Sequence, residues 1–117
     1  MMQKNVLVVD DHPEIRDLMV KILEKRDYQV STASDGHDAL TQFALDRPDL
    51  VITDLSMPGM NGYQLCRLIR GISSVPLLIM SAPKGVEEKA YEMGADVFVS
   101  KPFDMEALGA EIDELLL

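Results

Sequence analysis

The sequence predicts an α/β fold: a doubly wound, five-stranded parallel sheet with five helices in layers on its two faces. Short, almost wholly aliphatic runs alternate with longer segments in which apolar residues recur at helical spacing. A continuously apolar strand is expected where both faces of a sheet are covered, as they are in parallel sheets. Strands that alternate with helices in this way are joined by right-handed crossovers. With 117 residues, the chain is expected to form one domain spanning residues 1–117.

The first half of the chain supplies two strand–helix pairs. Residues 5–9 (NVLVV) form a predicted strand, and a helix begins near His12-Pro13, because the first helical turn does not need the N–H that proline lacks. Residues 28–33 (YQVSTA) alternate only in part, which favours a strand near a sheet edge, and the next helix ends before Pro48. The inward faces of the two helices are expected to hold Ile15, Leu18, Met19, Ile22 and Leu23, and Ala39, Leu40, Phe43 and Ala44.

A third pair follows in the middle of the chain. Residues 50–53 (LVIT) form a buried strand, and the loop LSMPGMNG leads from it into a helix. Residues 76–80 (PLLIM) form the fourth strand. Cys66 is expected to be a half-buried residue of the helix between them, and as the single cysteine it cannot form an internal disulfide. The inward face of this helix is expected to hold Leu65, Leu68 and Ile69.

The last third of the chain completes the pattern. A short, weakly patterned helix is predicted over residues 84–93, followed by a fifth strand over 97–99 (VFV). Asp104 is the expected N-cap of the last helix, where Phe103 can pack onto Leu108. The inward face of that helix is expected to hold Met105, Leu108, Ile112 and Leu115.

The composition limits the classes of function. The chain has 11 Lys and Arg residues against 20 Asp and Glu residues, a formal net charge of −9. Such an acidic surface repels phosphate backbones, so direct nucleic-acid binding by this domain is not expected. No apolar run approaches the ~18 residues of a membrane span, and the first residues do not resemble a signal peptide. A cytoplasmic location without a membrane partner is therefore expected.

Polar side chains follow four of the predicted strands where each strand ends. Asp10 and Asp11 follow the first strand and Asp54 follows the third. Ser81 follows the fourth strand, and Lys101 lies just beyond the fifth. In open parallel sheets, ligands bind beyond the carboxyl ends of the strands at the topological switch point. Three carboxylates, a hydroxyl and an ammonium group are therefore expected to converge on one edge.

This set of groups indicates phosphoryl chemistry. Clustered carboxylates repel one another unless a cation neutralises them, and an all-oxygen set on an open edge suits Mg²⁺. Lys101 and Ser81 can contact a phosphoryl oxygen, and phosphoryl transfer requires mostly positioning and charge neutralisation. The nucleophile must then be a carboxylate. Asp54 is the better candidate, because Asp10 and Asp11 share the end of one strand whereas Asp54 stands alone.

The segments VLVVDD, DLVITDLSMPGMNGYQL, PLLIMSA and GADVFVSKPF together resemble the receiver domain of two-component response regulators, of the chemotaxis-regulator type. The resemblance covers essentially the whole chain. It implies a flavodoxin-like three-layer sandwich with strand order 2-1-3-4-5. It also implies a switch that accepts a phosphoryl group from a histidine kinase or phosphotransfer protein and controls a downstream effector or a fused output domain.

The resemblance also implies a role for each site residue. Asp54 is the expected phospho-acceptor in a Mg²⁺-dependent reaction. Asp11 and Asp54, helped by Asp10, are expected to hold Mg²⁺ together with the backbone carbonyl of Ser56, and Mn²⁺ could replace it. Lys101 is expected to bind the phosphoryl group.

Two further residues are expected to transmit the signal. The Ser81 hydroxyl would move toward the phosphoryl group, and Phe98, three residues before Lys101, would turn inward behind it. This would remodel the face formed by the fourth helix, the fifth strand and the fifth helix, where a phosphorylation-dependent homodimer could form. The bond between Lys101 and Pro102 is expected to be cis.

The chain departs from the family pattern near its output face. Ser81 lacks the methyl group of threonine, so its rotamer is less constrained. Pro83 removes a backbone donor, and the segment between Ser81 and Lys101 is shorter than usual, which compresses the fourth helix. Phe98 has no hydroxyl to stabilise an inward state.

Other functions remain as alternatives. A pseudo-receiver would bind partners without phosphorylation, although every acidic and lysine position is filled. An Asp-nucleophile phosphatase would need a second acid two residues after the nucleophile, where this chain has Ser56. No glycine-rich loop follows the first strand, which opposes nucleotide binding. The domain is therefore expected to catalyse only its own phosphorylation and dephosphorylation. His12 could be a metal ligand, but the sequence favours a turn residue at a helix start.

Overall fold

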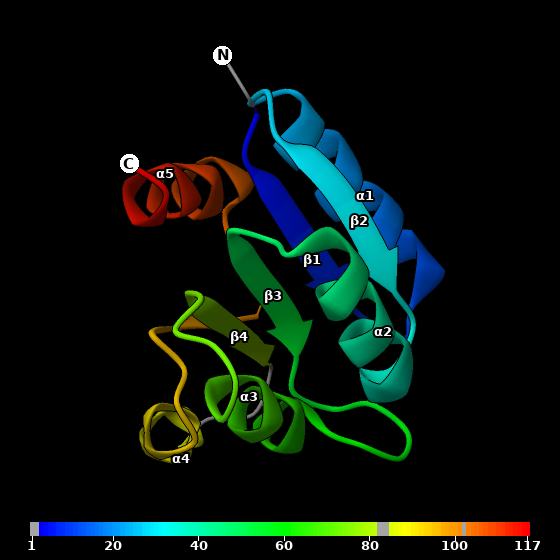
Figure 1. Cartoon of the computed structure of the whole chain (residues 1–117). Helices are drawn as coiled ribbons and strands as arrows, with labels where there is room; N and C mark the ends of the chain where they lie inside the picture. Colours follow the sequence, from blue (N-terminus) through cyan, green and yellow to red (C-terminus); the bar gives the residue numbers. More distant parts are fainter. Residues whose placement is uncertain (1–2, 82–84, 102) are drawn as a thin grey trace.

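The computed structural model describes residues 3–81, 85–101 and 103–117, and it confirms the predicted α/β fold (Figure 1). Five parallel strands lie in the order β2-β1-β3-β4-β5, so the second strand is an edge strand, as its partial alternation indicated. The strands are β1 (Asn5–Val9), β2 (Gln29–Ala33), β3 (Leu50–Asp54), β4 (Leu77–Ser81) and β5 (Val97–Ser100). The helices are α1 (Pro13–Glu24), α2 (Gly36–Asp46), α3 (Gly62–Arg70), α4 (Glu87–Glu92) and α5 (Met105–Leu115).

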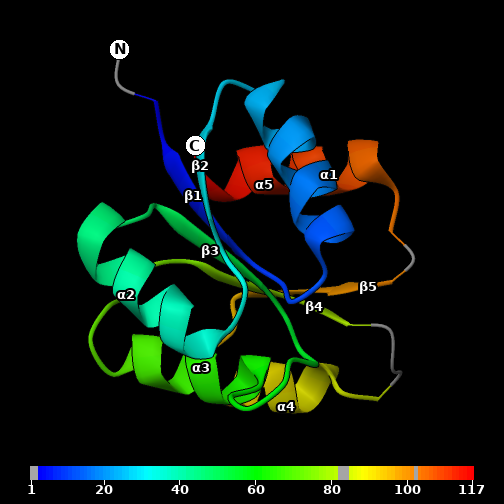
Figure 2. The ribbon, with the colours of Figure 1, turned by 90° about the vertical axis from the view of Figure 1, so that its right-hand side faces the viewer.

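The helices cover the sheet in two groups, which gives the molecule three layers (Figure 2). Helices α2, α3 and α4 pack on the face toward which Leu7 and Val9 of β1 point. Helices α1 and α5 pack on the opposite face, with Val6 and Val8. All four of these β1 residues are fully buried, which is why the strand reads as a continuous apolar run. No helix in the described part of the chain is long and apolar enough to cross a membrane.

Three residues expected on inward helix faces are exposed instead: Leu68, Ala44 and Met105. On α3, which turns about 100° per residue, Leu65 and Ile69 define the buried direction, and Cys66 and Leu68 lie equally far from it on opposite sides. Packing places the Cys66 side in the core, so Cys66 is fully buried rather than half-buried. Met105 lies on the inward face of α5, but in the first turn of the helix, where it lines an open groove beside α1.

The ends of the elements follow the predicted signals closely. Every strand differs from its predicted range by at most one residue at either end. Asp104 is the N-cap of α5, and its side chain accepts a hydrogen bond from the Glu106 amide at 3.1 Å. Helix α4 is only six residues long, in keeping with the short segment that contains it. Pro83 and the Lys101–Pro102 bond lie outside the described residues.

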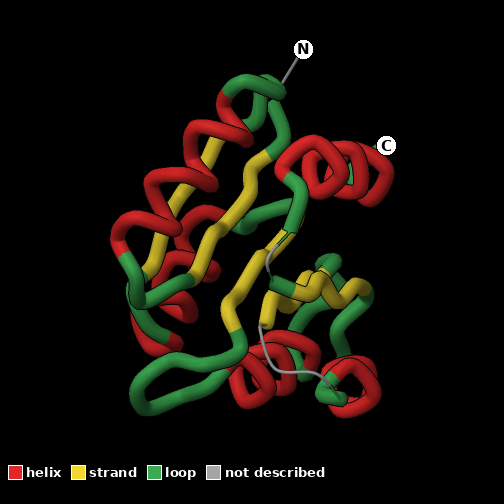
Figure 3. Tube along the Cα trace, turned by 180° about the vertical axis from the view of Figure 1, so that it is seen from behind, coloured by secondary structure: helices red, strands yellow, loops and turns green. Residues whose placement is uncertain are grey.

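The loop between β3 and α3 extends from the carboxyl edge of the sheet (Figures 1 and 3) and returns to it at Gly62. The Gly62 amide donates to the Leu55 carbonyl at 2.8 Å. A side chain at this position would bring its Cβ within 2.6 Å of the Asp54 carbonyl oxygen and 2.9 Å of the Leu55 Cα. The start of α3 therefore lies against the backbone of the strand that carries Asp54, and only glycine fits there.

We expect Gly62→Ala to lower the free energy of unfolding by about 1–3 kcal/mol, because the methyl group must displace backbone rather than a mobile side chain. Urea denaturation followed by circular dichroism measures the change. Gly71→Ala at the other end of α3 is the matched control. There φ is −67° and the nearest atom to a Cβ is 3.4 Å away, so the substitution should be neutral or slightly stabilising. Equal stability of the two variants would contradict the close approach.

Candidate functional site

The carboxyl edge of the sheet gathers the polar residues that the sequence singled out. Asp54 is the last residue of β3 and Ser81 the last of β4, while Asp10 and Lys101 directly follow β1 and β5. Because the strands are parallel and covered on both faces, three of these polar side chains are almost without solvent contact. Asp10 is 0% exposed, Ser81 1% and Asp54 5%. The fold thus brings these four distant parts of the chain into one buried polar cluster.

Lys101 is the cation of this cluster. Its Nζ lies 3.1 Å from Asp54 Oδ1, to which it donates a hydrogen bond, and 3.9 Å from Asp10 Oδ2. Burial raises the pKa of the Asp54 carboxyl above its ordinary value of 3.8, and the hydrogen bond and charge of Lys101 oppose that rise. Asp10 adds to the rise through charge repulsion. The carboxyl group proposed as nucleophile is therefore held in a dry, strongly charged environment.

The acidic residues fit a divalent cation. One ligand atom from each of Asp10, Asp11, His12 and Asp54 lies within 4.8 Å of the others. Asp10 Oδ2 and Asp11 Oδ1 are buried and have no hydrogen-bond partner in the described residues. Buried carboxylate oxygens without partners are unfavourable unless a cation neutralises them, and hard oxygen donors suit Mg²⁺. Ser56 lies exposed in the loop two residues after Asp54, and its role as a carbonyl ligand stays a prediction.

The two residues predicted to transmit the signal, Ser81 and Phe98, lie on neighbouring strands. The Ser81 hydroxyl is buried and has no hydrogen-bond partner among the residues described. Phe98 lies on β5 opposite Ile79 of β4 and is half-buried against the core on the α2–α4 side of the sheet. Its position is compatible with inward movement, which remains a prediction.

Two side chains near the acids were not assigned to the site from the sequence. His12 is the N-cap of α1, as a turn residue at a helix start, but its Nδ1 lies 3.1 Å from Asp10 Oδ1 and 3.2 Å from Asp11 Oδ1. The hydrogen bond that the His12 ring donates to Asp10, followed by the charges of Asp11 and Asp10, raises the pKa of His12 above 6.5. Arg16 donates to the backbone carbonyl of Asp10 at 2.7 Å. Its place one helical turn after His12 was the only sequence signal for this contact.

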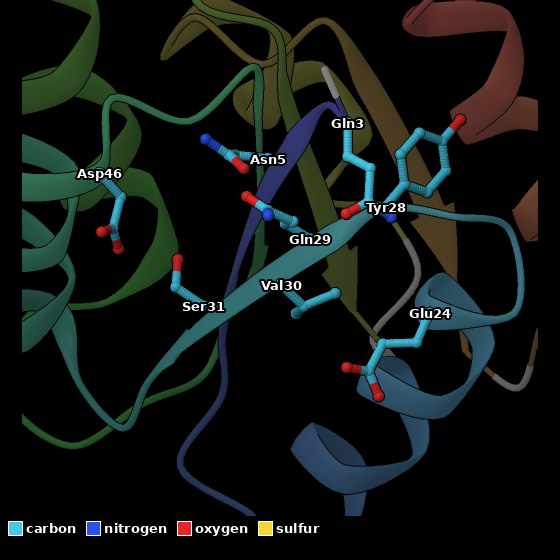
Figure 4. Close-up of a pocket in the computed structure, with 8 residues that line it drawn as sticks. All are labelled: Gln3, Asn5, Glu24, Tyr28, Gln29, Val30, Ser31 and Asp46. Atoms are coloured by element: carbon cyan, nitrogen blue, oxygen red, sulfur yellow. The ribbon is translucent and has the colours of Figure 1, made fainter. Parts of the chain in front are cut away.

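A polar groove of about 500 Å³ lies far from this cluster, at the amino ends of β1 and β2 (Figure 4). Asn5 and Gln29, which face each other in the strand register, lie side by side in it. The groove contains none of the residues that the sequence predicted for the site. The carboxyl edge, where the unpartnered acidic oxygens lie, is therefore the candidate site.

The fold and the residues at the carboxyl edge of the sheet together define a class of protein. It is a flavodoxin-like α/β domain with a buried acidic cluster and a lysine at the carboxyl ends of its strands. The model of the response regulator receiver domain matches residues 6–113, and the chain belongs to that family. Phosphorylation-controlled switching is the general function of the family.

Known proteins from several organisms are similar over nearly the whole chain. "Probable transcriptional regulator ycf27" of Cyanophora paradoxa is 40% identical over 116 residues, 97% of this chain and 48% of that protein. The structure resembles chemotaxis response regulator CheY4 of Vibrio cholerae, with a TM-score of 0.90, 30% identity and coverage of 98% and 100% of the two chains. It also resembles TrrA of Thermotoga maritima, solved in complex with Mg²⁺-BeF, with a TM-score of 0.90, 33% identity and coverage of 97% and 100%. The chain spans about half the length of the curated relatives it matches.

We expect Asp54→Asn to raise the free energy of unfolding at pH 7, without divalent metal, by about 1 kcal/mol, because it removes a charge from a buried site. The folded-state pKa of Asp54 lies above its unfolded value of 3.8, so the native carboxyl is favoured in its neutral form. Its ionisation therefore lowers stability as pH rises from 3.8 through the raised folded value. The advantage of the variant should grow across that window and then level off.

Urea denaturation in EDTA at several pH values between 3.5 and about 8 measures this difference. Asp46→Asn, at the exposed end of α2, is the control and should show no such growth. A variant that is less stable than the wild type at pH 7 would show that the Lys101 pair outweighs burial.

Proposed function

We propose that this domain is a phosphorylation-activated switch of a two-component phosphorelay, with Asp54 as the phospho-acceptor. The observation that carries the proposal is the buried Asp54–Lys101 pair, 3.1 Å apart, beside two acidic residues with unpartnered oxygens. The donor is a sensor histidine kinase or a phosphotransfer protein. The domain catalyses only its own phosphorylation and dephosphorylation, and it works in the cytoplasm.

The chemistry follows from the placement of the side chains. An Asp54 carboxylate oxygen attacks the phosphorus of the donor phosphohistidine, the P–N bond breaks with its electron pair going to nitrogen, and an acyl phosphate forms. Asp10, Asp11, Asp54 and the Ser56 carbonyl would hold Mg²⁺, or Mn²⁺ as a substitute, and the ion would neutralise charge on the phosphoryl oxygens. Lys101 already lies at the attacking carboxylate, so its ammonium group can stay with the phosphoryl group after transfer.

Ser81 and Phe98 respond to the phosphoryl group on Asp54. The Ser81 hydroxyl has no hydrogen-bond partner among the described residues, so a phosphoryl oxygen on the neighbouring strand offers it an acceptor. Movement of Ser81 leaves room behind it for Phe98 of β5. The face formed by α4, β5 and α5 changes as a result, and either a partner protein or a second copy of the domain binds it.

The output lies outside this domain. The relative named as a probable transcriptional regulator is about twice as long as this chain. We propose that the switch controls a downstream effector or an attached output domain. Any contact with DNA belongs to such an output domain, because this domain carries a net charge of −9.

Incubation with Mg²⁺ and acetyl phosphate should add the mass of one phosphoryl group, measured by intact-protein mass spectrometry. Asp54→Ala should add none, because the nucleophile is gone, and chelation of Mg²⁺ should abolish the addition in the wild type. Asp46→Ala, which removes an exposed carboxylate at the far end of α2, is the matched control and should be phosphorylated normally. An unchanged wild-type mass, also with a cognate kinase, would favour the pseudo-receiver.

Ser81→Ala should separate phosphorylation from its consequence. The variant should still be phosphorylated, and without phosphate it should be more stable by about 1 kcal/mol, because a buried unpartnered hydroxyl is removed. Hydrogen exchange of α4 and β5 should then no longer respond to phosphorylation. Ser100→Ala is the control, since Ser100 lies opposite Ser81 in the register but is exposed. A full response in Ser81→Ala would exclude Ser81 as the transmitter.

A further inference from the structure

His12 lies at the acidic site, and the function proposed above gives it no role. It is the N-cap of α1, with φ −94° and ψ 115°. An N-cap side chain ordinarily accepts a hydrogen bond from the first turn of its helix, but the His12 ring makes no such bond. Its Nδ1 points to the acids instead, 3.1 Å from Asp10 Oδ1 and 3.2 Å from Asp11 Oδ1. The ring therefore belongs to the acidic cluster rather than to the helix cap.

The spacing of these atoms fits a shared metal ion. At a metal–ligand distance of about 2.1 Å, adjacent ligands of an octahedral ion lie about 3 Å apart and opposite ones about 4.2 Å apart. The two distances from Nδ1 to the carboxylate oxygens match adjacent ligands. One ligand atom from each of Asp10, Asp11, His12 and Asp54 falls within 4.8 Å of the others, close to the span of such a shell.

Asp10 supplies an independent indication that the site suits a cation. Its side chain is fully buried, and its Oδ2 has no hydrogen-bond partner within the described ranges. Lys101 Nζ, at 3.9 Å, is too far away to donate to this oxygen. The other oxygen of the same carboxylate, Oδ1, is the one that the His12 ring approaches. Asp10 thus offers an unpartnered oxygen to a cation, and the imidazole nitrogen of His12 lies beside the same carboxylate.

We propose that His12 is a nitrogen ligand of the metal site and sets its metal preference. An imidazole ligand strengthens the binding of Mn²⁺ and, more strongly, of Ni²⁺ relative to Mg²⁺, which prefers oxygen donors. The site therefore accepts transition-metal ions more tightly than an all-oxygen site would. The inference rests on the proposed function, because it concerns the same metal site, but it adds a residue and a selectivity to it.

Isothermal titration of the untagged, full chain with MgCl₂ and NiCl₂ tests the selectivity. His12→Asn should lower Ni²⁺ affinity about tenfold or more and leave Mg²⁺ affinity within about threefold, because the amide offers oxygen in place of nitrogen. Asparagine is also a preferred N-cap residue, so α1 should remain folded. The chain has two histidines, and His37→Asn on the exposed start of α2 is the matched control that should change neither affinity.

Electron spin echo spectroscopy of the Mn²⁺-loaded protein supplies a readout of the bond itself. The wild type and His37→Asn should show the ¹⁴N coupling of a directly bound imidazole, and His12→Asn should not. The proposal holds only if both the Ni²⁺ affinity and the ¹⁴N coupling depend on His12. If either is independent of His12, the residue only donates a hydrogen bond to the acids, and the proposal falls.

The outcomes also separate this proposal from the function on which it rests. Mg²⁺-dependent phosphorylation of Asp54 with no dependence of metal binding on His12 would overturn the proposal alone. Binding of Ni²⁺ and Mn²⁺ through His12 without phosphorylation of Asp54 would overturn the proposed function alone. A wild type that binds none of the three ions would overturn both.

Discussion

The constraint on which this structure depends is a carboxylate held out of water at the end of a central strand. Asp54 is 5% exposed, and the cation that compensates it, Lys101, directly follows β5 rather than the adjacent strand β4. The pair therefore spans β4, and Ser81 ends that intervening strand. Lys101 follows directly on β5, the strand that carries Phe98, so the pair joins Asp54 to that strand. The ion pair that compensates the buried charge thus also connects the site to the edge strand β5.

Parallel pairing explains why this arrangement could be predicted from the sequence. Runs that are apolar at every position end abruptly at Asp10, Asp54 and Ser81, and parallel strands place all such ends at one edge. Neither the recognition of where these runs end nor the alignment of their ends at one edge requires a known distance or side-chain angle. The inward faces of the helices were harder to predict, because a nine-residue helix such as α3 has a narrow apolar stripe. There Cys66 and Leu68 flank the Leu65–Ile69 stripe at equal angles on opposite sides, and only packing against the sheet selects Cys66 for burial.

Contacts that depend on local backbone geometry could not be predicted in the same way. The direction of the His12 ring is set by its extended conformation at the N-cap, where the usual expectation is a bond to the helix. Arg16 contacts the Asp10 carbonyl only because α1 begins at a particular residue and angle. Gly62 lies against the Asp54 carbonyl, a close approach that a glycine in a loop does not by itself indicate. Each depends on the backbone angles and direction of the chain at one place, which the residue types and their spacing do not specify.

The same cluster connects stability to switching. Asp10 and Asp11 each have a buried oxygen, and Ser81 a buried hydroxyl, without a partner among the described residues. Each such atom disfavours the fold as it stands, by about 1–3 kcal/mol for a neutral group and more for a charged one. A cation and a phosphoryl group would supply the missing partners. The unpartnered atoms that lower the stability of the metal-free, unphosphorylated domain therefore favour the binding of both groups. A domain with these atoms satisfied internally would be more stable, but it would gain less from binding a cation or a phosphoryl group.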